Sequence, residues 1–406
     1  MFDFAVIGKG LIGASAARSL ASVSDNVAVI GPDEPAHLAT HDGIFASHYD
    51  QGRITRVLDE NLLWATLAQR SIQTYGEIEK ESGIRFHYPA GAMRVGHDTS
   101  AHRAYITNNC RIGTQLGATF QDYDTQTLED KFPYFQFSSK AIALHETGGA
   151  GFINPRALIQ AQLKIAEFKG ATILRDIVKN VEIEADHCRI DTHNGQIYEA
   201  RKVLIATGAF TNFFALTGRS LDWKVVAESI LLAELSEASL ERIRTMPSLM
   251  YRVPVDGDPE NPNYWPAYLV PPTVYPDGRT YLKIGIGNQR DRIFTSLSEI
   301  NHWFRTGPSA ATHDHLLSVL MQILPDLEIC STQAHPCALT FTATNHPYID
   351  VVEPQKIFMA VGGCGYAGKS AVEIGRIGAQ LAIQGHWTEA IAPVRKSDDF
   401  RAAYVA

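Results

Sequence analysis

The sequence predicts an α/β protein (α+β overall) in which a Rossmann-like nucleotide-binding domain carries a second, inserted domain. Three observations lead to this fold class. The apolar run FDFAVIG enters a G-x-G-x-x-G loop at residues 8–13, and a further strand, NVAVIG, follows near residue 27, which is the size of one βαβ unit. A second apolar run enters a glycine-rich turn at residues 357–370. Between them, residues 251–285 split into short apolar runs separated by Pro, Gly, Asn and Asp, which is typical of an antiparallel sheet.

The first loop is expected to hold the phosphates of a dinucleotide. Gly8 permits the tight turn, Gly10 lets the backbone approach a pyrophosphate, and Gly13 allows the helix to pack closely on the strand. Leu11 and Ile12 begin the apolar face of that helix, whose N-terminus faces the phosphates. The loop alone does not separate NAD from FAD.

The ribose contact departs from the usual pattern, which has Asp or Glu at the end of the second strand. Here that strand ends in Gly31, and Asp33 and Glu34 follow just beyond it. Either one of these two acids reaches back to the ribose hydroxyls, or backbone and water hold them.

The next helix and strand are predicted from the residues at their ends. Asn154 is a good N-cap, Pro155 suits the first helical position, and Gly170 ends that helix before a strand. The strand at residues 202–210 runs into a small-residue turn that contains Gly208.

The last strand runs into a second glycine-rich turn, which holds Gly362, Gly363 and Gly365. A helix follows, and we expect it to be capped by Ser370 and ended by Gly385. Such a turn near the C-terminus suggests a nucleotide site assembled from both ends of the chain.

Composition bounds the class of protein. The 406 residues are 45% hydrophobic and carry a formal charge of −8 without a run of Lys or Arg, which favours two domains and gives no reason to expect nucleic acid or an anionic membrane as a partner. No export signal or membrane span is evident, and five cysteines lack C-x-x-C spacing, so a cytoplasmic location is expected. His313 and His315 lie two apart and point in different directions, so no metal is expected.

At four places the chain resembles the FAD-dependent amine oxidases of the D-amino-acid oxidase superfamily, and most closely their monomeric sarcosine oxidase and N-methyltryptophan oxidase branch. These are the first loop, SHYDQGRITR (47–56), YLKIG (281–285), and HPCALTFTATNHPYID through GGCGYAGKS (335–370), in the family's order. The resemblance implies FAD. It also implies a discontinuous FAD-binding domain, expected at 1–90, 145–220 and 334–392, and a substrate-binding domain with an antiparallel sheet over the flavin, expected at 91–144 and 221–333.

The resemblance also assigns the flavin contacts. Cys337 matches the cysteine that this branch joins through sulfur to the flavin C8 methyl, although Leu339 stands where the branch usually has Tyr and Thr344 where it usually has Asp. The expected cofactor-binding residues are Gly8, Gly10, Leu11, Ile12, Gly13, Asp33, Ser47, Arg53, Gly208, Cys337, Gly363, Gly365, Tyr366 and Lys369.

The resemblance implies one arginine and one lysine on the substrate carboxylate, and a second arginine beside the flavin. Arg53 and Arg56 would ordinarily be a solvated basic pair, but the matching positions put one beside the flavin and the other on the carboxylate. The planar guanidinium suits bidentate carboxylate binding. Lys369 matches the second carboxylate ligand, at the start of the C-terminal helix.

Two further residues are expected at the reacting end of the flavin. Lys283 lies in an apolar strand, where a lysine usually points to solvent, but it matches the family lysine near flavin N5, and Tyr268 matches an active-site tyrosine. Gly287 stands where sarcosine oxidase has a histidine. With Leu339, this removes two polar groups from the pocket and favours a larger or more apolar amine than sarcosine.

The resulting expectation is a flavin-dependent oxidation of a secondary or N-alkyl amino acid to an imine, with oxygen as acceptor and hydrogen peroxide as product. The alternatives are a D-amino-acid or primary amine oxidase, or a dehydrogenase with another electron acceptor. A tRNA-modifying flavin domain is disfavoured because no basic patch is evident. An FAD-binding protein with only a structural role is also disfavoured, because the joint presence of Arg56, Lys283 and Lys369 would then be a coincidence. The oligomeric state stays open, and a monomer fits.

Overall fold

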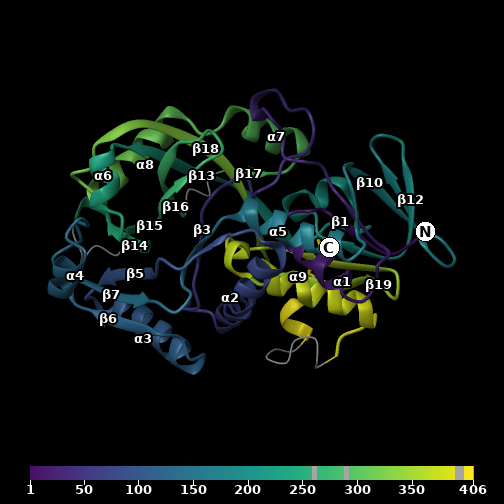
Figure 1. Ribbon diagram of the computed structural model, residues 1–406, viewed down its shortest axis with the longest axis horizontal. Coiled ribbons are helices and arrows are strands. Elements are labelled where there is room, and N and C mark those ends of the chain that lie inside the picture. The colour runs from purple at the N-terminus through teal and green to yellow at the C-terminus, as the bar shows by residue number, and fades with distance from the viewer. Residues whose placement is uncertain (258–262, 288–291, 389–396, 406) are drawn as a thin grey trace.

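Two large β-sheets organise the chain and lie side by side along the long axis of the molecule (Figure 1). The computed structural model describes every residue except 258–262, 288–291, 389–396 and 406. The mixed α/β fold class with an antiparallel second sheet, predicted from the sequence, is confirmed.

The first sheet has eight strands in the order β10-β11-β12-β1-β2-β9, with β20 beside β12 and β19 beside β20. The pairs β1–β2, β1–β12, β2–β9 and β12–β20 are parallel. Its short central strands are buried throughout, as parallel strands covered on both faces should be. The strand bounds are β1 Phe2–Ile7, β2 Val27–Ile30, β9 Thr172–Leu174, β10 Val178–Ile183, β11 Cys188–Thr192, β12 Ile197–Ile205, β19 Tyr348–Glu353 and β20 Ile357–Val361.

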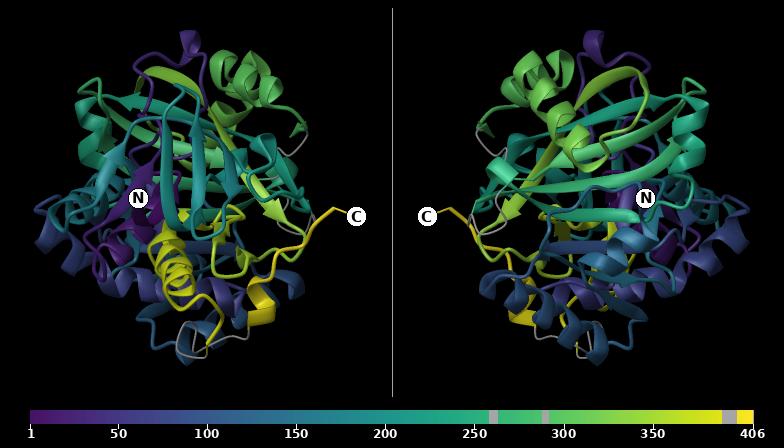
Figure 2. Two further views of the ribbon diagram at one scale, coloured as in Figure 1. Left: turned by 90° about the vertical axis from the view of Figure 1, so that its right-hand side faces the viewer. Right: turned by 90° about the vertical axis from the view of Figure 1, so that its left-hand side faces the viewer.

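Four helices accompany the first sheet, namely α1 (Leu11–Leu20), α2 (Leu62–Ser82), α5 (Pro155–Phe168) and α9 (Ala367–Gln384). Helices α1 and α9 come from opposite ends of the chain and pack against each other. A side chain at Gly375 of α9 would clash with the backbone of α1. Figure 2 (left) shows the purple N-terminal segment beside the yellow C-terminal helix. The fold therefore brings the two glycine-rich turns together.

The predicted helix ends are confirmed except for one cap. The Asn154 side chain accepts from the backbone N–H of Ala157 at the start of α5, and Gly385 ends α9 in the left-handed conformation. The prediction that Ser370 caps α9 is wrong. That helix begins at Ala367 after Tyr366 without a side-chain cap, and Ser370 is buried inside its first turn, because the glycine-rich turn closes earlier than the serine suggested.

The second sheet has nine strands in the order β17-β13-β16-β15-β14-β5-β7-β6, with β18 beside β13. Every pair in it is antiparallel except β5–β14. The strand bounds are β5 Ala92–His97, β6 Phe120–Tyr123, β7 Ala141–Glu146, β13 Trp223–Leu235, β14 Ser248–Pro254, β15 Tyr264–Val274, β16 Thr280–Ile286, β17 Ile293–Phe294 and β18 Ile329–Thr342.

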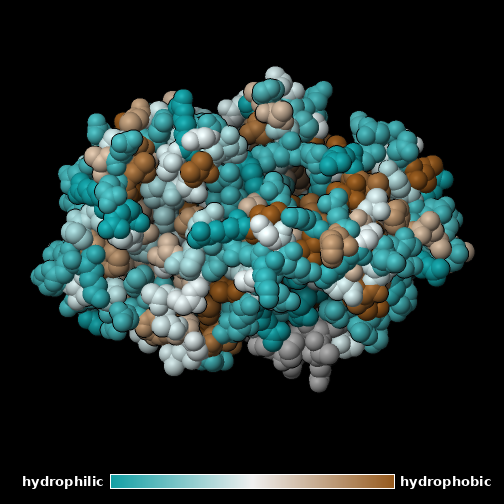
Figure 3. Space-filling view, in the orientation of Figure 1, coloured by the Kyte–Doolittle hydropathy of each residue, from teal (hydrophilic) through white to brown (hydrophobic). Residues whose placement is uncertain are grey.

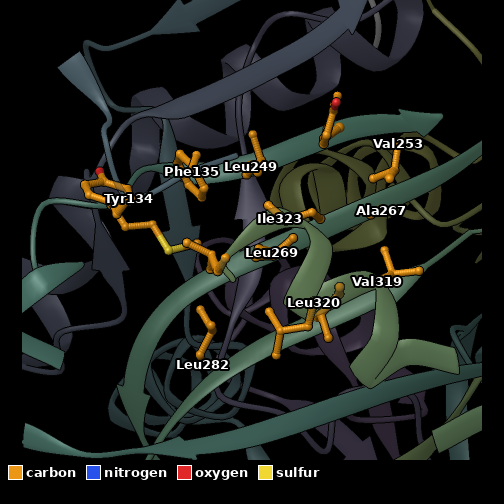
Figure 4. Close-up of a cluster of buried hydrophobic side chains, with 14 of the residues drawn as sticks. Tyr134, Phe135, Leu249, Val253, Ala267, Leu269, Leu282, Val319, Leu320 and Ile323 are labelled. Carbon is orange, nitrogen blue, oxygen red and sulfur yellow. The ribbon is translucent and has the colours of Figure 1, made fainter. Parts of the chain in front are cut away.

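One face of the second sheet forms a hydrophobic core with α8 (Ala310–Ile323). Leu249, Ala267, Leu269 and Leu282 of β14, β15 and β16 meet Leu320 of this helix (Figure 4). Because side chains alternate along a strand, the residues between these core positions face the other way. That other face is the one that positions the candidate site.

The remaining elements connect and cover the two sheets. A small third sheet has the order β3-β8-β4. The bounds are β3 Arg53–Thr55, β4 His87–Tyr88, β8 Gly151–Ile153, α3 Ser100–Gln115, α4 Thr125–Lys131, α6 Glu237–Arg242 and α7 Leu297–Thr306, and the short 3-10 helices are Leu38–Thr40, Gly208–Phe210, Asn212–Phe214, Val255–Gly257 and Ser397–Phe400.

The division into two domains at the predicted boundaries stays a prediction. Residues 334–342, which the prediction placed in the FAD-binding domain, extend β18 and pair with β13 of the second sheet. Residues 389–392, at the end of the same predicted range, lie outside the described residues.

The face in Figure 3 is mainly hydrophilic, with apolar residues scattered across it. Within the described residues, none of the helices combines the length and the apolar character that a membrane span needs.

Candidate active site

A cavity of about 790 Å³ opens between the two glycine-rich turns and the second sheet. Its walls come from the first loop, residues 44–60, the β13–β16 strands, β18 and the turn before α9. Most of the site residues predicted from the sequence line it together, namely Gly8, Gly10, Leu11, Ile12, Ser47, Arg53, Arg56, Gly208, Tyr268, Lys283, Cys337, Gly363, Gly365, Tyr366 and Lys369.

Two helices begin at this cavity without a side-chain cap. They are α1, whose N-cap is Gly10, and α9, whose N-cap is Tyr366. The other seven α-helices in the described part of the chain each begin with an Asn, Thr, Asp or Ser side chain that accepts from the first turn. The first-turn N–H groups of α1 and α9 are therefore left for another acceptor, and such helix ends favour negative charge.

The first loop fits a dinucleotide closely. Gly8 has a φ of +98° and a side chain there would meet Ala206, while a side chain at Gly13 would overlap the carbonyl oxygen of Gly8. A Cβ atom at Gly10 would instead meet only the ring of His48, at 3.8 Å. The loop is tight where it turns and open where it faces the cavity, as a pyrophosphate requires. The residues present therefore fit FAD.

A buried carboxylate, Asp50, joins two of the predicted cations. The Lys283 Nζ lies 2.7 Å from Asp50 Oδ2, and both side chains are 1% exposed. The Arg53 Nε lies 3.2 Å from the same oxygen. Lys283 also donates to the carbonyl oxygen of Gly52. A lysine in an apolar strand is thus held inside the molecule, because Asp50 and a carbonyl satisfy its ammonium group.

A second buried carboxylate, Asp59, joins the other predicted cations. Its Oδ2 lies 2.7 Å from Lys369 Nζ, 3.5 Å from Arg56 Nη2 and 3.7 Å from Arg94 Nη2. Three cations thus share Asp59, while Glu60 acts on Arg94 and Glu146 acts on Arg56 and Lys369 from further away. The buried Arg94 Nε has no hydrogen-bond partner among the described residues, so the cluster keeps a cationic donor for another acceptor.

Burial and charge shift the pKa values of both clusters. Burial lowers the pKa of Lys283 to about 8 and that of Lys369 to about 7, although Asp50 and Asp59 oppose the shift. Burial alone would raise the pKa values of the two carboxyls, but the neighbouring cations hold both well below the usual range. Both carboxylates are therefore ionised at neutral pH, and Lys369 titrates there.

A row of side chains on the second sheet forms one wall of the cavity. Arg94, Met250 and Tyr268 are register partners across β5, β14 and β15, and Gly285 follows on β16. A side chain at Gly285 would overlap the Tyr268 ring, so the glycine makes room for the tyrosine. Burial raises the pKa of Tyr268 well above its ordinary value, and Glu228 adds to this shift, so the phenol stays protonated and can donate.

Cys337 is 4% exposed and lines the cavity from β18. Its Sγ lies 3.5 Å from Arg53 Nη2, which also donates to the carbonyl oxygen of Ser47 at 2.8 Å. The indole N–H of Trp303 donates to the backbone oxygen of Cys337 at 2.9 Å. The thiol is thus fixed beside a guanidinium and faces the space that the cofactor would fill.

Gly13 and Asp33, two predicted cofactor contacts, do not line the cavity. Gly13 packs against Gly8, as its expected role requires. Asp33 pairs with Lys9 and Arg175, while Glu34 pairs with Arg156. Both acids just beyond the second strand are therefore engaged with cations at the edge of the loop.

The two histidines considered as metal ligands lie in a helix and have other partners. His313 and His315 lie within α8, because Ser309 caps that helix ahead of them. His313 bonds to Thr332, and the ring of His315 packs against Trp265. Across the described ranges, no group of three metal-binding side chains is found.

Asp50, Asp59 and Arg94 are site residues that sequence reasoning missed. Asp50 precedes Arg53 by three residues, and Asp59 follows Arg56 by three. That repeated spacing was a usable signal for the two ion pairs. Arg94 had no such signal, because its contact with Asp59 joins β5 to the segment before α2 and shows no short, repeated spacing in the sequence.

Comparisons with known proteins agree with this geometry. A family model described as "FAD dependent oxidoreductase" matches residues 3–381. The chain is 24% identical over 391 residues to monomeric sarcosine oxidase from Bacillus sp. (strain B-0618), covering 95% of this chain and 93% of that protein. It is 23% identical over 212 residues to N-methyl-L-tryptophan oxidase from Escherichia coli (strain SMS-3-5 / SECEC), covering 52% of this chain and 54% of that protein.

Among solved structures, the fold is similar to NikD, an unusual amino acid oxidase essential for nikkomycin biosynthesis. The TM-score is 0.75 at 16% identity, covering 100% of this chain and 98% of that chain. At this identity the likeness concerns the fold alone.

Proposed function

The chain belongs to the family of FAD-dependent oxidoreductases, and we propose that it oxidises a secondary or N-alkyl amino acid, with oxygen as electron acceptor and hydrogen peroxide as product. The similarity to monomeric sarcosine oxidase and N-methyl-L-tryptophan oxidase supports this substrate class. FAD supplies the hydride acceptor for the substrate carbon and returns two electrons to oxygen.

One observation carries the proposal. Two buried ion clusters, one around Asp50 and one around Asp59, flank the same cavity as the two uncapped helix ends. A cofactor site alone would need the helix ends and the glycine loop. A second, anionic ligand would use the cations that share Asp59 and the unpaired Arg94 Nε.

Arg56 and Lys369 are the proposed ligands of the substrate carboxylate. Arg56 keeps its charge at all working pH values, and Lys369 gains its proton near neutrality. Fixing the carboxylate orients the adjacent C–H bond, and such positioning is worth up to about 7–11 kcal/mol in well-aligned reactions. As the hydride leaves, the nitrogen lone pair forms the C=N bond, and water then hydrolyses the imine.

Lys283 is the proposed group for the oxygen step. Reduction of oxygen by one electron creates an anion, which a fixed positive charge stabilises in a water-poor site. The Lys283 ammonium is buried and keeps its charge through Asp50. Tyr268 covers the same region, with Lys283 Nζ 5.7 Å from its ring centroid.

Cys337 is the proposed attachment point for the flavin. Its buried thiol lies beside Arg53 and opens onto the cavity. Attachment there would hold the cofactor against the second sheet, since β18 pairs with β13 along most of its length.

The deciding experiment is a peroxide-coupled screen of the FAD-loaded protein against N-methyl, cyclic and D-amino acids. We expect turnover with N-alkyl or cyclic amino acids, and little with their decarboxylated analogues. Anaerobic bleaching of the flavin without peroxide formation in air would favour a dehydrogenase with another acceptor. Turnover restricted to primary D-amino acids would contradict the proposed substrate class.

A further inference from the structure

One cation of the cavity, Arg252, has no role in the reaction proposed above. Along β14, Leu249, Tyr251 and Val253 belong to the hydrophobic core, while Met250 and Arg252 alternate with them and line the cavity. Arg252 therefore shares a face with the residue that contacts the carboxylate ligands, rather than pointing to solvent.

The position of Arg252 follows from the strand. Met250 Sδ lies 2.8 Å from Arg56 Nε, so this row touches the proposed carboxylate site. Arg252 is two residues further along, which corresponds to about 7 Å in an extended strand. The cavity thus contains a further guanidinium one side-chain row beyond Met250, the residue that contacts Arg56.

Two aromatic rings lie against this guanidinium. The Arg252 Cζ lies 3.7 Å from the Tyr105 ring centroid and 4.7 Å from that of Tyr264. His97 Nε2 donates to the backbone oxygen of Arg252 at 2.7 Å, and the His102 ring packs edge-on against Tyr264. Stacking holds the plane of the guanidinium and leaves its N–H edge available to an acceptor.

Arg252 differs from the other arginines of the cavity in its partners. Arg53 pairs with Asp50, and Arg56 and Arg94 pair with Asp59. Within the described residues, the recorded side-chain contacts of Arg252 are aromatic, and no carboxylate forms an ion pair with it. Two acidic residues also line the cavity. The charge of Glu60 raises the pKa of Arg94, and the charge of Glu228 raises the pKa of Tyr268.

The residues beside Arg252 on the neighbouring strand are small or compact and leave space for a ligand. Its register partner on β15 is Pro266, and Gly287 donates its backbone N–H to the Pro266 oxygen at 3.0 Å. Among the described residues, a Cβ atom at Gly287 would meet nothing closer than 3.6 Å. Pro266 and Gly287 add no long side chain beside Arg252, which favours a substituent larger than a methyl group there.

We propose that Arg252 binds a second carboxylate of the substrate. The substrate is then a secondary amino acid with two carboxylates, one next to the oxidised carbon and one at the end of its larger substituent. The first is held by Arg56 and Lys369 and the second by Arg252. This inference rests on the proposed function and narrows its substrate class from secondary amino acids in general to dicarboxylic ones, in place of the apolar substituent that the sequence favoured.

The first test compares N-methylglutamate with N-methylglutamine, each as both enantiomers, in the peroxide assay. The readout is the ratio of kcat/KM for the acid over the amide. We expect the wild type to prefer the acid by about tenfold or more, the effect of one hydrogen bond to a charged group. Arg252→Gln should bring the ratio close to one, and Arg252→Lys, which keeps the charge without the stacked plane, should give an intermediate ratio.

Arg219→Gln is the matched control, because Arg219 stacks on Tyr404 at 4.2 Å and does not line the cavity. It should keep the ratio of the wild type. A ratio near one in the wild type, or a ratio unchanged in both Arg252 variants, overturns the inference while the proposed oxidation stands.

The second test measures binding without turnover. Isothermal titration of the FAD-loaded protein with succinate, glutarate and adipate, each against its monoamide, should show at least one diacid that binds about tenfold more tightly than its monoamide. Arg252→Gln should abolish that difference. If no N-alkyl amino acid is oxidised but this difference is present, the proposed function fails and the second carboxylate site stands. Equal binding of every pair overturns the site itself.

Discussion

At the scale of single residues, Asp50 and Asp59 explain how four charged side chains remain inside this protein. A buried cation without a partner would lose its proton or open its site to water. Lys283 and Lys369 keep buried positions because each has a carboxylate at 2.7 Å. The same carboxylates are shared with Arg53 and Arg56, so neither lysine is fully neutralised. Each cluster can therefore still act on an added negative charge.

Lys283→Met tests whether that charge serves the oxygen step. The variant keeps the apolar stem and removes the ammonium, and Arg53 still compensates Asp50. We expect anaerobic reduction of the flavin by substrate to change modestly and reoxidation by oxygen to slow by about 10²-fold, a loss of a few kcal/mol. Stopped-flow measurement of the two half-reactions separates these effects.

Lys202→Met is the control for that experiment. Lys202 donates to the carbonyl oxygens of Ala382 and Ile383 and lies outside the cavity. It should lower stability while leaving reoxidation intact. Unchanged reoxidation in Lys283→Met would contradict the role proposed for Lys283.

Lys369 makes carboxylate binding dependent on pH. Burial lowers its pKa to about 7, so the ammonium is charged below this value and neutral above it. Affinity for a carboxylate should therefore fall as pH rises through 7, by up to about tenfold per pH unit. Titration of glutarate into the FAD-loaded protein between pH 6 and 9 measures this. Lys369→Met should bind more weakly below pH 7 and lose the dependence, whereas an unaltered pH profile in the variant would assign it to another group.

At the scale of elements, the glycine loop and the start of α5 are the features that sequence patterns predict best. The jobs of Gly8 and Gly13 depend on residues within the same strand–loop–helix unit, so a local pattern contains them. The cap at Asn154 is local as well. The cap expected at Ser370 failed because the preceding turn, not the serine, decides where α9 begins.

The contacts between distant elements were not predictable in the same way. Arg94 of β5 contacts Asp59 in the segment before α2, and Arg252 of β14 contacts Tyr105 of α3. These contacts join different elements of the chain, and no local periodicity records them. The family resemblance pointed to the cations of the site, but not to the carboxylates that pair with them. Only the spacing of three residues between each carboxylate and its arginine could have indicated those carboxylates.

Gly13→Ala tests the loop as an element. The new methyl group would overlap the carbonyl oxygen of Gly8, which is backbone and cannot rotate away. We expect the loop to shift and the purified protein to contain much less FAD, measured by absorbance at equal protein concentration. Gly76→Ala is the control, since Gly76 is exposed in α2 with nothing within 4 Å of its Cβ position. It should keep its FAD and gain up to about 1 kcal/mol of stability, and equal FAD loss in both variants would contradict the role of the loop.

At the scale of the whole molecule, the cavity lies between the two sheets, and the segment at residues 44–60 contacts elements on both sides of it. Asp50 in that segment pairs with Lys283 of the second sheet, and Asp59 pairs with Lys369 of α9 beside the first. A cofactor between the sheets would add contacts to both. FAD binding should therefore stabilise the whole fold, and not only the loop that binds its phosphates.

The way in which that stabilisation depends on free FAD distinguishes covalent from reversible attachment. A reversible ligand stabilises the fold more as its free concentration rises, by about 2.7 kcal/mol at a hundred times its Kd. FAD bound through Cys337 is always present, so the Tm of the wild type should not change with added FAD, and acid precipitation should leave a yellow pellet. Cys337→Ser should release FAD into the supernatant and acquire a Tm that rises with added FAD. Cys364→Ser is the control, because Cys364 also lines the cavity and is buried, and it should keep the yellow pellet. A colourless wild-type pellet with an FAD-dependent Tm would refute the covalent bond and leave FAD as a reversible cofactor of the same cavity.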